Sequence, residues 1–548
     1  DSVRFPSVSA DGNIVIFEQG FHCWKLNRSS GQIVPLEFLA AEDLPNTGVE
    51  DLNFSSATSA SLSPDGKQVA FGCQGDLLVR RTEKGLPANR VDAHPARDDD
   101  PVWLPGAKKL LFVSRRSGTE DLYTVRSSEA GEPRLDRCLT TEVKRFPGPE
   151  VRRRSPGLSP DGRQIAFLHG DGDLAVQDLD GGHFRILHSG WAPVEFRWSP
   201  DSQWIAYSTL DQDFNRDVWL VRSDGTMFPF NLSANPRPDL NPAWSPDGRK
   251  LCFVSQRDEE GGDLWWLWLR KEDFQQTRED RILDDDPPEE PPSAAPKKDS
   301  PKKDPPKSDP PPSEEPQSSA PGSALAGDDK PDPEASKSAP KPIKVVEEKK
   351  VEVQIDLDGI RNRFQRAFAS DKSVGSPIWS LDSKKVYFNS SHEGSAALYS
   401  LSIPQDGSAK KLAAGSSAIV EWNRKSKKML RIVSGVPTTV TASGSSVALT
   451  FARKFPVDML ARRRAVFDEA WATMRDRFYD PKMKGLDWQA LGDRYREIAV
   501  ARRDPTEFAS IINRMIGELN SSHQRFTPAK RWSKTIRATG VPGWRLEP

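Results

Sequence analysis

Over most of the chain, apolar residues come in short runs, and many of these runs follow a short polar turn. Ser63-Pro64-Asp65-Gly66, for example, precedes Val69-Ala70-Phe71. Proline fixes φ and Asp-Gly reverses the chain, so the phrase predicts a tight turn that leads into a buried β-strand. The aspartate is expected to cap the turn backbone rather than to bind a ligand. Five copies of this arrangement begin at these residues: Ser9, Ser63, Ser159, Ser199 and Ser245.

The spacing of these phrases predicts a β-propeller. From Asp65 onward the turns lie about 40 to 56 residues apart, except for one long gap between Asp247 and Asp382, and a period of about 40 to 50 residues is typical of propeller blades. Weaker copies of the phrase occur at Trp103, Trp379 and Trp422. Most copies continue into a second strand, beginning at Asp121, Asp173, Asp217 and Asp263. Since about 40 residues suffice for the four strands of a blade, the predicted fold is mainly β.

The long gap holds a segment of different composition. From Asp284 to about Lys344 the chain consists mostly of Pro, Lys, Asp, Glu, Ser and Ala. Such a segment cannot bury enough apolar surface to offset its ordering entropy, so we expect residues 284–344 to be disordered, with local polyproline character. We interpret the segment as a solvated loop between two blades. A ligand for an aromatic-lined groove is the alternative interpretation.

Beyond about Phe455 the apolar residues recur at three- and four-residue steps, which predicts helices. Residues 462–478 have one apolar face of this kind, and Trp488 to Ile498 indicate a second helix. The third helix has a clear start, with Asp504 as N-cap and Pro505 at the first helical position. We expect these three helices to form a small bundle after the propeller.

Composition and charge exclude several classes of protein. The chain has 548 residues, of which 36% are hydrophobic and 29% charged, as is ordinary for a globular chain of two to four domains. A net charge of −1 provides no field for nucleic acid or an anionic membrane, and no run of 18 apolar residues is present. The four cysteines lack CxxC spacing and are expected to be buried thiols, which favours a reducing, cytoplasmic compartment. The chain begins at Asp1 without an initiator Met, which suggests the cut end of a longer polypeptide.

Chemically distinctive residues are sparse. The sequence contains no GxSxG, HExxH, GxGxxG or P-loop motif, and its seven histidines lack metal-ligand spacing, so we expect no cofactor and no metal. His183 and His188 are expected at the surface. His523 stands out because it directly follows the third predicted helix, whose end would present it toward a cleft. Ser522 and His523 are chain neighbours and hence not a nucleophile and base pair, and from the residues alone a capping or solvent-facing histidine is the competing interpretation.

The tail also resembles the start of the catalytic core in the tricorn protease family, which is related to the carboxy-terminal processing serine proteases. The resemblance covers about sixty residues and lies in several uncommon words in the same order: Val466-Phe467-Asp468-Glu469-Ala470-Trp471, Met474 through Pro481, Gly485-Leu486-Asp487-Trp488, and Gly517 through His523. Upstream, Ile355 to Ile360 and the repeated turn phrases resemble the same family.

This resemblance implies a serine peptidase in which His523 is the general base and Ser522 is an auxiliary serine that orients the active-site network. The family's nucleophilic serine and its glutamate partner lie beyond a PDZ-like domain, and residues 524–548 do not align with the family. We therefore expect the parent protein to hydrolyse peptides and to be a homo-oligomer, with no nucleic acid or membrane partner. The present chain alone is expected to be inactive.

The family carries a six-bladed and then a seven-bladed propeller ahead of the core, which implies a domain layout. Residues 1–50 would be the last blade of a truncated upstream propeller, and residues 51–453 a seven-bladed propeller that contains the insertion 284–344. Residues 454–548 would be the helical start of the protease core. By family analogy the propeller controls the access of peptides to that core. Two alternatives stay open: an isolated eight-bladed ring, and a non-enzymatic propeller scaffold that resembles TolB, with the helical tail as a docking element.

Overall fold

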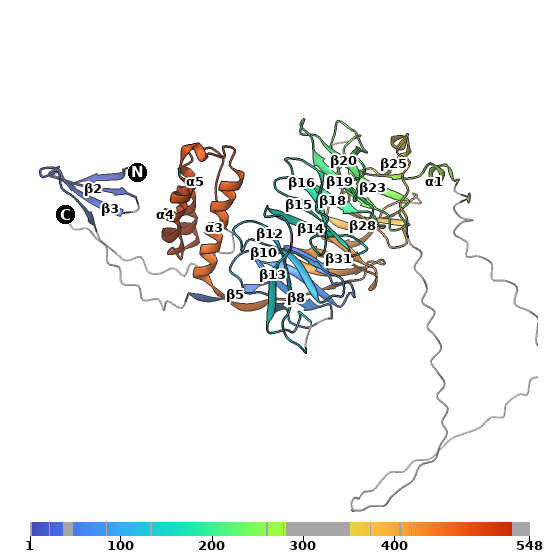
Figure 1. Ribbon diagram of the computed structural model, residues 1–548, viewed down its shortest axis with the longest axis horizontal. Helices are drawn as coiled ribbons and strands as arrows, with labels where there is room; N and C mark the ends of the chain where they lie inside the picture. Colours follow the sequence, from blue (N-terminus) through green and yellow to red (C-terminus); the bar gives the residue numbers. More distant parts are fainter. Residues whose placement is uncertain are drawn as a thin grey trace, which may run out of the picture. The chain divides into compact units, whose positions relative to one another are not determined.

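The chain forms two compact units, which are described separately below (Figure 1). One unit combines Asp1–Phe54 with Ala452–Pro548, and the other contains Ser55–Phe451. The computed structural model describes residues 3–20, 22–36, 48–83, 85–131, 134–258, 261–277, 279–280, 351–372, 374–404, 408–415 and 417–528. The predicted disorder of residues 284–344 therefore lies outside the described residues.

The unit Ser55–Phe451 consists of seven four-stranded antiparallel sheets, each built from four consecutive strands. The strands of the first three sheets are β6 (Ser59–Leu62), β7 (Gln68–Cys73), β8 (Asp76–Arg81) and β9 (Asn89–Arg90); β10 (Asp98–Trp103), β11 (Lys109–Ser114), β12 (Asp121–Ser127) and β13 (Thr141–Arg145); and β14 (Arg153–Leu158), β15 (Gln164–His169), β16 (Asp173–Asp178) and β17 (Arg185–His188).

The fourth and fifth sheets contain β18 (Glu195–Trp198), β19 (Trp204–Leu210), β20 (Arg216–Arg222) and β21 (Phe230–Asn231), and β22 (Asp239–Trp244), β23 (Lys250–Ser255), β24 (Asp263–Trp268) and β25 (Phe364–Phe368). The last two contain β26 (Val374–Trp379), β27 (Lys385–Ser390), β28 (Ala397–Ser402) and β29 (Lys410–Ala414), and β30 (Ser417–Asn423), β31 (Lys428–Val433), β32 (Val436–Thr441) and β33 (Ser446–Ala448). A short helix α1 (Lys271–Gln275) follows β24, and a 3₁₀ turn η1 (Ile360–Arg363) precedes β25. The predicted seven-bladed propeller is confirmed.

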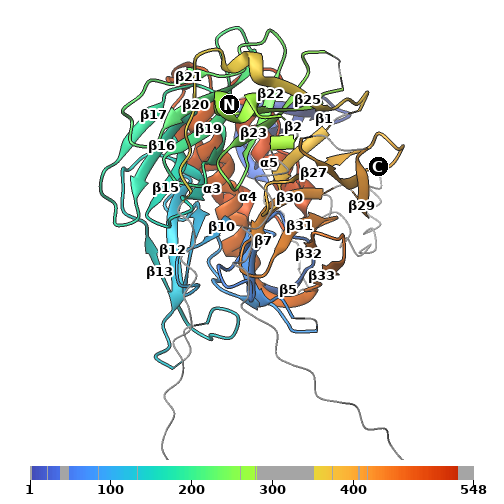
Figure 2. The ribbon, with the colours of Figure 1, turned by 90° about the vertical axis from the view of Figure 1, so that its right-hand side faces the viewer.

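The sheets follow one another around a ring that closes without exchange of a strand (Figure 2). The first strand of the first blade, β6, contacts β30 and β31 of the last blade. At this junction the Glu421 carboxylate accepts hydrogen bonds from the Leu62 backbone N–H at 2.6 Å and the Ser61 hydroxyl at 3.2 Å. The Asn423 amide donates to the Ser63 carbonyl at 2.8 Å. Because blades one and seven touch directly, the alternative of an eight-bladed ring is wrong.

The repeated turn phrase is held by a serine and an aspartate that bond to each other. In one copy the Ser199 hydroxyl donates to Asp201 Oδ1 at 2.5 Å and accepts from the Trp204 N–H at 2.8 Å. The same Asp201 oxygen accepts from the Gln203 N–H at 3.1 Å, and Ser199 is fully buried. Equivalent Ser–Asp bonds occur at Ser9, Ser63, Ser159, Ser245 and Ser380. The predicted structural role of the turn aspartates is confirmed.

A tryptophan at the end of a blade's first strand ties that blade to the blade before it. The Trp103, Trp198, Trp244 and Trp379 indoles donate to the carbonyls of Ser61, Gly157, Arg197 and Ala243, at 3.2, 2.9, 3.0 and 3.0 Å respectively. Each acceptor lies in the first strand of the preceding blade. Two of the weak copies of the turn phrase begin with these tryptophans, Trp103 and Trp379, but nothing in the residues themselves predicted a bond between blades.

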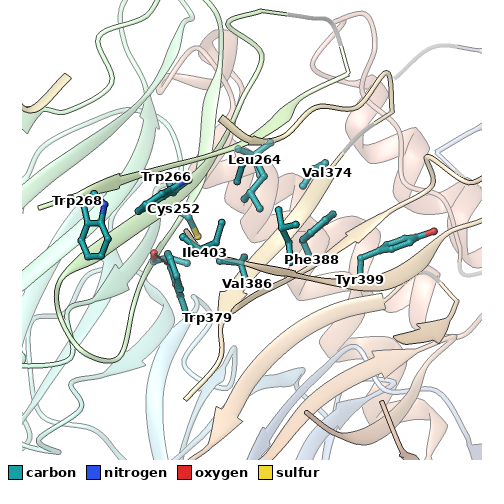
Figure 3. Close-up of a cluster of buried hydrophobic side chains, with 14 of the residues drawn as sticks. Cys252, Leu264, Trp266, Trp268, Val374, Trp379, Val386, Phe388, Tyr399 and Ile403 are labelled. Atoms are coloured by element: carbon teal, nitrogen blue, oxygen red, sulfur yellow. Dashed lines mark hydrogen bonds between the residues drawn. The ribbon is translucent and has the colours of Figure 1, made fainter. Parts of the chain in front are cut away.

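Apolar side chains fill the spaces between blades, as in the cluster between the fifth and sixth blades (Figure 3). Trp266 and Cys252 come from the fifth blade and Trp379 from the sixth, and each is at most 2% exposed. At its edge, the Lys250 ammonium lies 4.8 Å from the ring centre of Trp268 and 5.4 Å from that of Trp379, which is within cation–π range. The predicted burial of Cys73 and Cys252 is confirmed, and all four cysteines are free thiols.

The long insertion lies within a blade. Residues 281–350 fall between β24 and β25, which pair in one sheet with Leu264 opposite Phe368 and Leu267 opposite Phe364. The interpretation as a loop between two blades was therefore wrong. The third and fourth strands of a blade are joined by a surface turn that tolerates long insertions, and the sequence period alone did not distinguish this turn from a connection between blades.

The other unit contains one sheet, a two-stranded ribbon and three helices. The sheet consists of β1 (Arg4–Val8), β2 (Ile14–Gln19), β3 (His22–Asn27) and β4 (Ile33–Leu36) in that order, and the ribbon pairs β5 (Val49–Phe54) with β34 (Arg453–Asp458). The helices are α3 (Met459–Arg477), α4 (Trp488–Val500) and α5 (Pro505–Gly517), with a 3₁₀ turn η2 (Met483–Gly485) before α4. The three predicted helices are confirmed. None of the helices described is both long and apolar enough to cross a membrane.

Candidate active site

Three capped helices position the candidate residues. Asp458, Asp487 and Asp504 precede α3, α4 and α5, and their carboxylates accept backbone N–H bonds from Ala461, Ala490 and Thr506 at 2.9, 2.9 and 2.8 Å. Such side-chain caps satisfy amide groups that have no partner within the helix. Each helix start is therefore fixed by its sequence.

The three helices share one apolar core. It contains Phe467 from α3, Tyr495 from α4 and the α5 residues Phe508, Ile512 and Met515, all at most 4% exposed. The apolar period of three and four residues places these side chains on the inner faces. The C-terminal end of α5 is therefore held in place by the apolar core of the bundle.

Two tryptophans of the bundle bond to each other's backbone. The Trp471 indole donates to the Trp488 carbonyl at 2.9 Å, and the Trp488 indole donates to the Trp471 carbonyl at 3.2 Å. Gly492 of α4 provides the space, because a Cβ at that position would lie 2.5 Å from Trp471 Nε1. The residues that carry the strongest part of the resemblance thus pack the bundle and join α3 to α4.

The chain after α5 is anchored at its start. Leu519 is fully buried in the helical core, and the carbonyl of Asn520 accepts a hydrogen bond from Lys484 Nζ at 2.8 Å. One residue before Leu519, the Glu518 carboxylate accepts the phenolic hydrogen of Tyr495 at 2.6 Å. The burial of Tyr495 and this carboxylate raise the pKa of the phenol well above its usual range, so Tyr495 remains a donor.

The same segment is anchored at its end. The Asn513 side chain of α5 donates to the Phe526 carbonyl at 2.9 Å and accepts from the Phe526 N–H at 2.7 Å. The Phe526 ring also packs edge-on against Phe508, with ring centres 6.1 Å apart. Residues 521–525 therefore form a short loop between two fixed points, and we call them the histidine loop.

Ser522 and His523 lie at the exposed part of the histidine loop. His523 has a positive φ of 65°, a conformation that is uncommon outside glycine, although histidine is among the residues in which it is enriched. Among the residues that the structure describes, neither side chain has a hydrogen-bond partner in the protein. The imidazole is thus open to a group that approaches from outside the bundle, as a general base requires.

The histidines of the propeller have structural surroundings. His183 is 80% exposed, and its Nδ1 lies 2.7 Å from Asp178 Oδ2. His188 was expected at the surface, but it is half-buried against Tyr207, with ring centres 5.1 Å apart and its Nε2 atom covered. Burial lowers the pKa of His188. The apolar residues around His188 were too short a run to predict this packing.

Sequence reasoning missed the two residues that anchor the histidine loop. Asn513 lies between the buried residues Ile512 and Met515 of α5, but Arg514 follows it directly, so the sequence contains no clear sign of a specific bond at this position. Lys484 gave no signal of its own, because it lies in a turn that is distant from His523 in the sequence. No cluster of three or more His, Cys, Asp or Glu residues suited to a metal occurs within the described ranges.

Comparison with known proteins gives these features a family context. The family described as the tricorn protease C1 domain matches residues 460–517, which include the greater part of the three helices. The family described as the TolB β-propeller domain matches residues 47–227. The chain is thus similar to the tricorn proteases in its helices and to TolB in part of its propeller.

Individual relatives agree with this result. Putative tricorn protease homolog 2 of Streptomyces coelicolor is 33% identical over 121 residues, which cover 20% of this chain and 10% of that protein. A tricorn protease homolog of Saccharolobus solfataricus is 26% identical over 299 residues, 46% of this chain and 27% of that protein. A TolB homolog of Chlorobium chlorochromatii is 30% identical over 211 residues, 37% of this chain and 44% of that protein. The matched part of the chain spans less than half the length of these relatives.

The fold similarity to the tricorn protease covers most of the chain. Its crystal structure superposes with a TM-score of 0.65 and a sequence identity of 13%, over 96% of this chain and 47% of that protein. The superposition supports the fold assigned above.

Proposed function

We propose that the chain contributes the propeller and the histidine-bearing part of a serine-type peptidase. One observation carries this proposal: the segment 460–517, which matches the tricorn protease C1 domain, leads directly into an anchored loop that exposes His523. A surface histidine without a function needs no such fixed loop, whereas a general base must be held within reach of its substrate.

In this proposal His523 is the general base and Ser522 the auxiliary serine, as the family resemblance implies. The base accepts the proton of an attacking serine hydroxyl and then returns it to the leaving amine. Because no bond from His523 to a described residue is present, we propose that the attacking hydroxyl and the oxyanion donors come from polypeptide outside the described residues. The reaction requires no cofactor.

The propeller would control the access of peptides to this centre. In support of this role, the first strands of most neighbouring blades contact one another around the ring. By analogy with the relatives we further propose peptide substrates and a homo-oligomeric parent protein. The free thiols, three of them buried, support a reducing compartment such as the cytoplasm.

A non-enzymatic scaffold is the second candidate function. The match of residues 47–227 to the TolB β-propeller domain and the similarity to TolB homologs favour it. In that case the bundle would be a docking element, and the exposed His523 would have no chemical role. Activity measurements separate the two candidates.

The experiment uses the protein expressed from its complete gene and, separately, residues 1–548. Internally quenched peptides report hydrolysis, and a fluorophosphonate probe reports an activated serine. We expect the gene product to hydrolyse peptides and to bind the probe covalently, with no loss of activity in a metal chelator. We expect residues 1–548 alone to do neither. A gene product without peptidase activity would favour the scaffold, and hydrolysis by residues 1–548 would refute the divided active centre.

A further inference from the structure

A lysine from a distant turn holds the chain where it enters the histidine loop. Lys484 Nζ lies 2.8 Å from the carbonyl oxygen of Asn520. This carbonyl lies three residues beyond α5, near the C-terminal end of the helix, where the helix dipole places a partial negative charge. An ammonium group both bonds to such a carbonyl and interacts favourably with the helix dipole.

The turn that carries Lys484 is itself closely defined. The Asp480 carboxylate accepts from the backbone N–H groups of Lys482 and Lys484, both at 2.9 Å, and Met483 is buried in the helical core. Met483 and Lys484 have positive φ values of 49° and 54°. Non-glycine residues in this region are strained and persist only where the surrounding structure fixes them. The position of the Lys484 backbone is therefore set by the turn.

The histidine loop contains the same kind of backbone. Asn520 and His523 have positive φ values of 44° and 65°. A hydrogen bond from Lys484 Nζ to the Asn520 carbonyl thus joins two segments of unusual backbone that lie 36 residues apart in the sequence. Backbone of this kind collects at functional sites, where it aims a side chain that regular structure would direct elsewhere.

We infer that Lys484 is a positioning residue for His523. It fixes the Asn520 carbonyl, and with the Asn513–Phe526 bonds at the other end it sets the direction in which the imidazole points. This positioning role presupposes the general-base function of His523 that is proposed above. Lys484 acts through the backbone and not by contact with substrate, because its bond is to a carbonyl three residues before His523.

The sequence offers a matched control two residues away. Lys482 lies in the same turn and is exposed, as Lys484 is, but no bond from its ammonium is described. The variants are therefore Lys484→Met, which keeps the length of the side chain and removes the charge, Lys484→Arg, which keeps a donor, and Lys482→Met. Both positions are on the surface, so each of the three variants is expected to fold.

Two measurements on the 548-residue chain test the inference. Hydrogen exchange of the amides of residues 521–525 reports how firmly the loop is held, and NMR of isotope-labelled histidine reports the surroundings of the His523 imidazole, assigned with His523→Gln. In Lys484→Met we expect exchange to become about tenfold faster and the His523 signal to move toward that of an unstructured histidine. Lys484→Arg should restore both readouts, and Lys482→Met should change neither.

The inference is overturned if Lys484→Met keeps the exchange rates and the His523 signal of the original chain, or if Lys482→Met changes them equally. These readouts do not depend on catalysis. If the gene product lacks peptidase activity while the exchange results hold, the proposed function fails and the anchoring role of Lys484 stands. If activity is found while Lys484→Met changes nothing, only the positioning role fails.

Discussion

The propeller and the histidine loop use serine in opposite ways. In the propeller, Ser199 is fully buried and both its hydroxyl hydrogen and its oxygen are bonded within the turn. In the histidine loop, Ser522 is exposed, and no bond from it to another described residue is present. The polar atoms of the repeated phrase are therefore hydrogen-bonded within the protein, whereas the side chains of Ser522 and His523 have no such bond to a described residue. Catalysis is expected at polar side chains that have no hydrogen-bond partner within the protein but lie on a backbone that other contacts hold in place.

The largest effect on stability is expected at Trp379, because this large buried side chain both packs between two blades and donates a hydrogen bond from its indole N–H. Trp379 is 1% exposed, packs between two blades and bonds to the preceding one. Trp379→Ala should lower the free energy of unfolding of the propeller by about 3–5 kcal/mol, measured with urea. Trp379→Phe, which keeps an aromatic ring and loses the N–H, should cost about 1–2 kcal/mol. A cost below 1 kcal/mol for the alanine variant would show that the two blades do not depend on the Trp379 side chain.

The second prediction compares the two serines directly. Ser199→Ala leaves the buried N–H of Trp204 without its acceptor and should lower the free energy of unfolding by about 1–2 kcal/mol. Ser522→Ala removes no bond in the described structure and should change it by less than about 0.5 kcal/mol. If the two substitutions changed the free energy of unfolding equally in the same urea titration, the proposed difference between the structural Ser199 and the unbonded Ser522 would be wrong.

Asp100 is a residue of the ring that does not follow this pattern, and it provides the third prediction. It lies in β10, and no side-chain bond from it to a described residue is present; its burial and the neighbouring Asp99 charge raise its pKa to about 6. Because the folded-state pKa lies above the unfolded value of 3.8, stability falls as pH rises from about 4 to about 6 and stays reduced above that. Asp100→Asn removes this cost.

We expect Asp100→Asn to stabilise the propeller by about 1 kcal/mol at pH 8 and to have almost no effect at pH 4. The φ of 50° at this position suits asparagine as well as aspartate, so no backbone strain is added. Urea unfolding at the two pH values gives the result. A gain that is the same at both pH values would exclude titration of Asp100 as its cause.

The sequence predicted the repeated part of the fold more completely than the unrepeated part. Copies of one turn phrase gave the blade period, so β7, β15, β19 and β23 could be located from the residues alone. The three helices followed from their apolar period and from the cap at Asp504. The bonds between blades from Trp103 and Trp379 were not predictable, because they join residues that only the curvature of the ring brings together.

The candidate site was predicted only as far as local sequence allows. The position of His523 directly after α5 could be predicted from the sequence, and the resemblance to the tricorn family implied its role as a general base. The two anchors of the histidine loop could not be predicted. Lys484 lies 36 residues from Asn520 in the sequence, and Asn513 and Phe526 come into contact only once α5 has formed. The place of the insertion within a blade was missed for a similar reason, because strand pairing and not composition decides it.

The smallest effect on stability is expected at His523. Its side chain is exposed and no bond to it is described, so His523→Gln should change the free energy of unfolding of the bundle by less than about 0.5 kcal/mol. Circular dichroism of the helical signal during urea unfolding measures this. A loss above 1 kcal/mol would show that the histidine has a structural role, and the contrast with the ring would disappear.

The decisive measurement of whether His523 transfers a proton is a catalytic one. It is kcat/KM for peptide hydrolysis by the complete gene product, compared among the original protein, His523→Gln and the control His183→Gln, whose exposed imidazole is bonded to Asp178. The account predicts a loss of at least about 10³-fold for His523→Gln, as for removal of a catalytic base, and no loss for His183→Gln. Full activity in His523→Gln would contradict it.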